Sequence, residues 1–166
     1  GTPRYAARAS VATETPELEA PAEPADLAGL EGALYDGSLL FHGPKLQVIS
    51  KLQGLADGGA VAELTVDACP PDVGMVDGAL QLALLWTRKA LRGRSLPMAV
   101  QSYRRGPGSL SEGPLKAILT GATKGADRGV SNVTIVDGAG AVVAQIDGVE
   151  TVVRPDDTQP AVGATP

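Results

Sequence analysis

The sequence predicts an α+β fold in which an antiparallel sheet curls around one long apolar helix. Two observations support this prediction. Residues 75–91 form a helical stretch that is apolar nearly all round, which is typical of a helix buried from several sides. Short runs rich in Val, Leu and Ile, separated by turns that contain Gly, stand before and after it. Strands on both sides of a single helix indicate a sheet packed onto that helix.

The chain is predicted to divide into four parts. Within residues 1–12, polar and apolar side chains partly alternate, which predicts a short strand that we interpret as the last strand of a preceding repeat. Residues 13–26 are rich in Pro, Glu and Ala and predict a solvated linker. Residues 27–154 are expected to form the folded domain, and residues 155–166 a disordered tail.

The domain is expected to open with a short helix and two strands. Asp26 can cap a helix over residues 27–34, because the leucines of that segment share one helical face. Residues 46–52 and 60–66 predict two strands, and Asp57-Gly58-Gly59 between them is a hairpin signal.

The long helix should begin after Asp72, its expected N-cap, and stop at Gly93. Four strands are predicted after it, with a bulge at Gly148 in the last one; they cover residues 96–104, 115–123, 130–136 and 141–153. An antiparallel sheet wrapped around a single central helix is the hot-dog fold, and we expect this architecture.

Composition narrows the class of function. A net charge of −5 without a stripe of Lys or Arg argues against a nucleic-acid partner. One Cys and one His argue against a disulfide framework and against a metal site built from protein ligands. No apolar run approaches the ~20 residues of a membrane span. Because no signal-peptide pattern occurs either, we expect a cytoplasmic protein.

Two polar residues interrupt the apolar helix. Asp77 and Gln81 stand four positions apart and therefore lie one turn apart on the same helical face. Burying a carboxyl group is costly unless the group is hydrogen-bonded or functional. The alternative is that Asp77 stabilises free N–H groups in the first turn of the helix. The residues alone leave both interpretations open.

Four motifs within residues 34–153 point to a family. They are Leu39-Leu40-Phe41-His42-Gly43-Pro44-Lys45-Leu46-Gln47, Asp77-Gly78-Ala79-Leu80-Gln81, Leu96-Pro97-Met98-Ala99-Val100 and Asp137-Gly138-Ala139-Gly140-Ala141-Val142-Val143-Ala144. In this order they resemble the second half of a dehydratase domain of polyketide-type synthases, and look closest to those of polyunsaturated fatty acid synthases. Such domains are double hot dogs, two similar repeats with the active site between them. The resemblance implies that this chain is half of a double hot dog.

The resemblance also implies roles for single residues. The family works with a His from the first repeat and an Asp from the second. Asp77 matches that catalytic Asp, and Gln81 matches the residue that positions it. His42 stands where the family carries an aromatic residue, often Tyr, so we do not expect it to be the catalytic base. The residues expected to line the substrate pocket are His42, Gly43, Pro44, Trp86 and Pro97.

The implied function is the second hot-dog half of a 3-hydroxyacyl-[acyl carrier protein] dehydratase, a lyase in a fatty acid or polyketide multienzyme. Elimination of water needs a base for the α proton and an acid for the leaving hydroxyl. A carboxyl group in apolar surroundings can keep its proton at neutral pH, so Asp77 is expected to be the acid. The first repeat, with its His motif, is not among these 166 residues, so we expect this half alone to be incomplete.

Partners follow from the same resemblance. No cofactor is expected, because the substrate is carried on the phosphopantetheine of an acyl carrier protein. The expected partners are that carrier protein and a neighbouring hot-dog repeat or a homodimer partner. A lone hot dog should leave apolar surface exposed, so we expect this chain to dimerise or to be poorly soluble.

Two alternatives stay open. The chain could be a non-catalytic, dehydratase-like module that docks or dimerises within the multienzyme, which the missing His would explain. It could also be a product-template domain of the cyclase type, which shares the double hot-dog plan.

Overall fold

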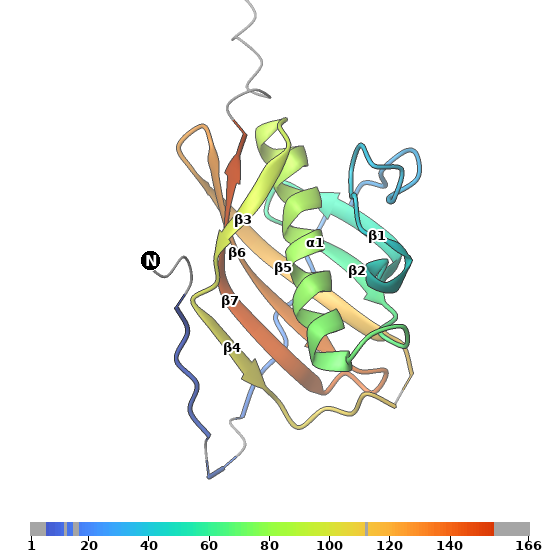
Figure 1. Ribbon diagram of the computed structural model, residues 1–166, viewed down its shortest axis with the longest axis vertical. Helices are drawn as coiled ribbons and strands as arrows, with labels where there is room; N and C mark the ends of the chain where they lie inside the picture. Colours follow the sequence, from blue (N-terminus) through green and yellow to red (C-terminus); the bar gives the residue numbers. More distant parts are fainter. Residues whose placement is uncertain (1–5, 12, 15–16, 112, 155–166) are drawn as a thin grey trace, which may run out of the picture.

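One antiparallel sheet and one long helix make up the fold (Figure 1). The computed structural model describes residues 6–11, 13–14, 17–111 and 113–154. The helix, α1 (Pro71–Leu91), lies along one face of the curved sheet, and a short 3-10 helix, η1 (Pro44–Leu46), precedes the first strand. The strands are β1 (Ile49–Ala56), β2 (Gly59–Leu64), β3 (Ser95–Ala99), β4 (Ser102–Arg105), β5 (Leu115–Lys124), β6 (Arg128–Val136) and β7 (Val142–Val153).

The strands follow the order β1-β2-β5-β6-β7-β3, and every neighbouring pair is antiparallel. β4 also pairs with β7, so that β3 and β4 share one edge of the sheet while β1 forms the other. The hairpin turns predicted at Asp57-Gly58 and at residues 137–140 are both present. An antiparallel sheet wrapped around a long helix is the architecture that the sequence predicts.

The helix is longer than predicted and differs at both ends. It begins at Pro71, because proline in the first helical position has its φ already set and needs no hydrogen-bond partner for a missing N–H. Asp72 is therefore inside the first turn, and the N-cap is Pro70. At the other end, Arg92 rather than Gly93 adopts the left-handed conformation, with φ of 55°.

The helix buries one side against the sheet. Met75, Leu82 and Trp86 are fully buried there. The indole of Trp86 lies so close to Gly121 that a Cβ on that glycine would come within 2.7 Å of the ring. The opposite side is only half-buried along Val76, Asp77, Leu80 and Leu84. Burial from all sides, which the apolar helix predicted, is therefore wrong for this stripe.

The segment before β1 contains no helix over residues 27–34. Instead Asp26 has a φ of 57°, and Ala28 forms an isolated antiparallel bridge with Leu55 through two backbone hydrogen bonds of 2.9 Å. The free edge of β1 thus takes the backbone groups that a helix would have used, and a tertiary contact overrides local helix preference.

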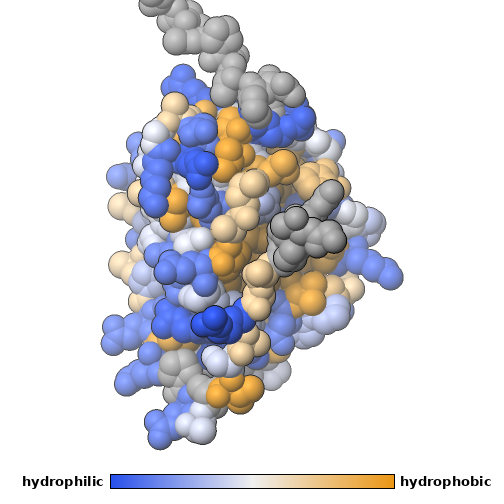
Figure 2. Space-filling view, turned by 60° about the vertical axis from the view of Figure 1, so that its left-hand side comes forward, coloured by the Kyte–Doolittle hydropathy of each residue, from blue (hydrophilic) through white to orange (hydrophobic). Residues whose placement is uncertain are grey.

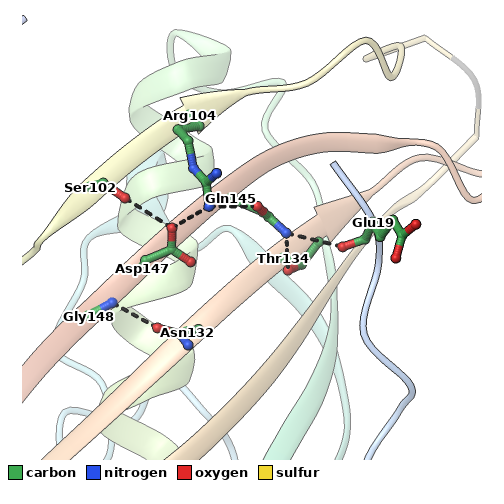
Figure 3. A network of polar contacts seen from close by, with 8 residues as sticks. All are labelled: Glu19, Ser102, Arg104, Asn132, Thr134, Gln145, Asp147 and Gly148. Carbon is green, nitrogen blue, oxygen red and sulfur yellow. Dashed lines mark hydrogen bonds and ion pairs between the residues drawn. The ribbon is translucent and has the colours of Figure 1, made fainter. Parts of the chain in front are cut away.

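Residues 17–26, within the predicted linker, lie against the sheet. Leu18, Pro21 and Pro24 are half-buried, and a spacing of three matches the threefold period of a polyproline II helix. The carbonyl of Glu19 accepts a hydrogen bond from Gln145 of β7, as Figure 3 shows. This segment is packed on the sheet rather than solvated throughout.

The strand predicted over residues 96–104 is divided into β3 and β4. Opposite the gap, Gly148 in β7 has a φ of 61°, and the pairing of β6 with β7 shifts register at the same place. The bulge predicted at Gly148 is thus confirmed. Its N–H donates to the side chain of Asn132, and the neighbouring Asp147 accepts from Ser102 and Arg104 of β4 (Figure 3).

Two predictions at the ends stand differently. Residues 6–11 form no strand, so the strand expected there is absent from the described part of residues 1–12. Its assignment to a preceding repeat stays a prediction. The tail predicted over residues 155–166 lies outside the described residues.

Candidate active site

Gln81 is the centre of a hydrogen-bond network on the helix. Its side chain is fully buried, and its Nε2 donates to Asp77 Oδ2 at 2.5 Å and to the carbonyl of Leu46 at 2.7 Å. Its Oε1 accepts from the hydroxyl of Tyr35 at 2.7 Å. Both N–H bonds of the amide are therefore used, and the direction of the amide is fixed.

Tyr35 is a site residue that the sequence did not predict. Its hydroxyl also accepts a hydrogen bond from the backbone N–H of Ile49 at 2.8 Å. Burial raises the pKa of Tyr35; the Ile49 hydrogen bond opposes this rise and the charge of Asp77 adds to it. The phenol therefore stays neutral and keeps donating to Gln81. No sequence signal marks Tyr35, because its segment was expected to follow a helix that does not form.

His42 approaches Asp77 from the loop before η1. Its Nε2 lies 3.8 Å from Asp77 Oδ2, and the two side chains are 12% and 23% exposed. The ring of Phe41 stacks on the imidazole at 4.7 Å between centroids and 16° between planes. Gln47 donates to the backbone carbonyl of His42 at 3.1 Å. Two motifs that are separate in the sequence thus meet at one carboxyl group.

Asp77 is the seventh residue of α1, beyond the first turn. Its Oδ2 faces Gln81 and His42, and among the described residues no hydrogen bond reaches Oδ1. A carboxylate that stabilises the free N–H groups of a helix must lie in the first turn. The structural alternative left open by the sequence is therefore wrong, and one carboxyl oxygen is left for another molecule.

Comparison with known families decides the relationship of the chain. A family described as the polyketide synthase dehydratase N-terminal domain matches residues 13–160. The chain belongs to the polyketide synthase dehydratase family. The description of the matched family names the N-terminal half, whereas the motifs predict the second half. The assignment of this dehydratase-family domain to one half is therefore a proposal.

A curated relative gives a broader context for this dehydratase-family domain. A large polyunsaturated fatty acid synthase polypeptide from Thraustochytrium sp. is 32% identical over 97 residues, which are 51% of this chain and 3% of the relative. The chain thus spans a small part of the length of that relative.

Solved structures confirm the hot-dog fold. The dehydratase domain of PpsC from Mycobacterium tuberculosis, solved in complex with C12:1-CoA, is 27% identical; its TM-score is 0.53, with 68% of this chain and 46% of that chain covered. AziG from S. sahachiroi is 21% identical, with a TM-score of 0.53 over 63% of this chain and 90% of that one. PaaI from E. coli is 17% identical, with a TM-score of 0.51 over 61% and 81%.

The other predicted pocket residues of this dehydratase-family domain lie in different places. Gly43 and Pro44 are exposed beside His42. Trp86 is fully buried, and its Nε1 donates to the carbonyl of Asp57 at 3.2 Å. It stands nine residues beyond Asp77, about 13 Å along the helix. Pro97 is exposed on β3, where it pairs with β7. The structure therefore brings His42 to Asp77 and Gln81, and places Trp86 in the core.

Neither a metal site nor a membrane helix occurs in the part of the chain that the structure describes. No group of three or more His, Cys, Asp or Glu side chains there could hold a metal ion. No helix in the same residues is long and apolar enough to cross a membrane.

Proposed function

We propose that this domain is the Asp-bearing half of a 3-hydroxyacyl-[acyl carrier protein] dehydratase and that Asp77 is the acid of the elimination. The observation that carries the proposal is the Asp77–Gln81 pair on α1, whose amide is fixed by Tyr35 and by the carbonyl of Leu46. A fixed, half-buried carboxyl with one oxygen unengaged is what a general acid needs.

The reaction divides the work between two groups. A base removes the α proton of the 3-hydroxyacyl thioester, and those electrons form the α–β double bond. The bond from the β carbon to oxygen breaks, and Asp77 gives its proton to the leaving hydroxyl, so that water and a 2-enoyl thioester result. The base regains the acid–base balance by holding the α proton. We assign the base to the neighbouring repeat, because His42 directs its Nε2 at the acid itself.

Two findings support an acyl thioester as the substrate class and a second repeat as the partner. The PpsC dehydratase domain, 27% identical to this chain, was solved with C12:1-CoA, and this chain covers 46% of it. By analogy the substrate of this domain is carried on the phosphopantetheine of an acyl carrier protein, without another cofactor. The Asp-x-x-x-Gln spacing of residues 77–81 supports the second half.

The surface offers a place for that second repeat. Large apolar side chains are exposed on β3, on the open side of α1 and beside His42; they are Leu96, Met98, Val73 and Phe41. Figure 2 shows apolar residues, in orange and tan, gathered down the middle of one face between hydrophilic margins. β3 is also a free sheet edge, and free edges pair readily with another strand.

The test is a pair of Asp-to-Asn substitutions in the synthase segment that carries this domain together with its neighbouring repeat. Asp77→Asn removes the acid proton, so formation of the enoyl thioester should fall by about 100-fold or more. Asp67→Asn, an exposed aspartate ahead of α1, is the matched control and should leave the rate unchanged. Mass spectrometry of the carrier-bound product measures both. Full activity of Asp77→Asn would show that the assigned role is wrong.

The exposed apolar face equally suits a second candidate, a non-catalytic docking module of the multienzyme. The same assay separates the two. A docking module gives no enoyl product in any variant, including the unchanged segment, while still holding the neighbouring repeat.

A further inference from the structure

His42 lies beside the candidate acid without a role in the proposed reaction. It is the single histidine of the chain. Its Nε2 points at the same carboxyl oxygen of Asp77 that receives the Gln81 amide. The family resemblance gives this position to an aromatic residue, so the contact is a property of this sequence.

The burial of the imidazole decides which nitrogen carries a proton. Nδ1 of His42 is buried and has no hydrogen-bond partner among the described residues, and the ring is covered by Phe41. A proton on Nδ1 would leave a buried N–H without an acceptor, which is costly. An imidazolium carries protons on both nitrogens and would have the same cost. The neutral form with its proton on Nε2 avoids it and turns an N–H toward Asp77.

We propose that His42 is a positioning residue for Asp77, and this inference rests on the proposed function. Its neutral Nε2–H and the Gln81 Nε2–H both act on Oδ2. The distance of 3.8 Å exceeds a direct hydrogen bond, so the Nε2–H acts through electrostatic attraction in a partly buried site. Two N–H groups facing Oδ2 keep it as an acceptor. The acid proton therefore resides on Oδ1, the oxygen that no described residue engages.

Nuclear magnetic resonance of the 166-residue chain tests this inference without substrate. With ¹⁵N-labelled histidine, one set of imidazole signals belongs to His42. We expect the pattern of a neutral ring protonated at Nε2 at neutral pH, and we expect these signals to shift in Asp77→Asn but not in Asp67→Asn. A ring protonated at Nδ1, an imidazolium, or signals unchanged by Asp77→Asn would overturn the inference.

Turnover in the two-repeat segment gives a second, independent readout. Glutamine can place its amide N–H near the position of Nε2, whereas the shorter asparagine reaches only the position of Nδ1. His42→Gln should keep most of kcat, and His42→Asn should lose about tenfold, with little change in KM. Equal rates for the two variants would exclude the N–H donor role.

The two readouts separate this inference from the proposed function. If the imidazole signals respond to Asp77→Asn while Asp77→Asn leaves dehydration intact, the contact stands and the acid assignment falls. If Asp77→Asn abolishes dehydration while the signals do not respond, the acid stands and the positioning role of His42 falls.

Discussion

At the scale of single residues, one buried amide determines how the candidate site is arranged. Gln81 connects Asp77 with the carbonyl of Leu46 and with Tyr35. Its spacing from Asp77 was visible in the sequence because both residues stand on one helix. Tyr35 and His42 come from irregular chain before β1, where no periodicity links a residue to its distant partners. The pair was therefore predictable, and the residues that hold it were not.

The hydroxyl of Tyr35 should be worth more to stability than an exposed hydroxyl. Tyr35→Phe leaves the N–H of Ile49 and Oε1 of Gln81 without this partner, and each such loss costs about 1–3 kcal/mol. We expect the free energy of unfolding to fall by about 2 kcal/mol, measured by urea denaturation. Tyr103→Phe is the matched control, since Tyr103 donates to Asp72 on the exposed surface, and should change stability by less than about 1 kcal/mol.

At the scale of elements, local patterns predicted what the helix and hairpins do but not what the free edges attract. The apolar run fixed the position of α1, and Gly-containing turns fixed both hairpins. The segment over residues 27–34 has a helical pattern, yet Ala28 pairs with Leu55 on the edge of β1. That pairing depends on a strand edge formed by distant residues, and helix preference of a few tenths of a kcal/mol per residue is too weak to resist it.

Asp137 couples the β6–β7 hairpin to the loop after β4. Its carboxylate accepts backbone hydrogen bonds from Ser109 at 2.8 Å, from Ala141 at 2.9 Å and from Ala139 at 3.0 Å. The hydrogen bond from Ser109, together with those from the turn, holds the pKa of Asp137 below its ordinary value, against the opposing effect of burial.

The stability that this lowered pKa provides is present above the ordinary pKa of an aspartate and is lost as the pH falls through the lowered value. We expect Asp137→Asn to unfold more readily at neutral pH and to lose less stability than the unchanged chain on acidification below about pH 4. Thermal unfolding across this pH range measures the difference. Asp127→Asn, an exposed aspartate, should follow the unchanged chain; identical curves for both variants would contradict the role of Asp137.

At the scale of the whole molecule, the chain has the dimensions of one hot dog within a larger enzyme. It covers 90% of AziG but 46% of the PpsC dehydratase domain. The fold and the apolar edge were predictable, because a single buried helix needs a sheet around it and that sheet has edges. What the sequence could not supply is the partner, since half of a shared site carries no record of the other half beyond the surface that it leaves uncovered.

That surface predicts self-association of the isolated chain. Leu96 and Met98 on β3 are 46% and 61% exposed, and burying such side chains is favourable by about 25 cal/mol per Å² of apolar area. We expect the chain to form dimers through β3 and the double variant Leu96→Lys with Met98→Lys to be monomeric, because paired lysines at a strand edge oppose pairing. Light scattering after size-exclusion chromatography measures both. Lysines at the exposed Leu30 and Leu110, which lie outside the strands, are the control and should leave the dimer intact. A stable monomer of the unchanged chain would count against a half-domain that needs a partner along β3.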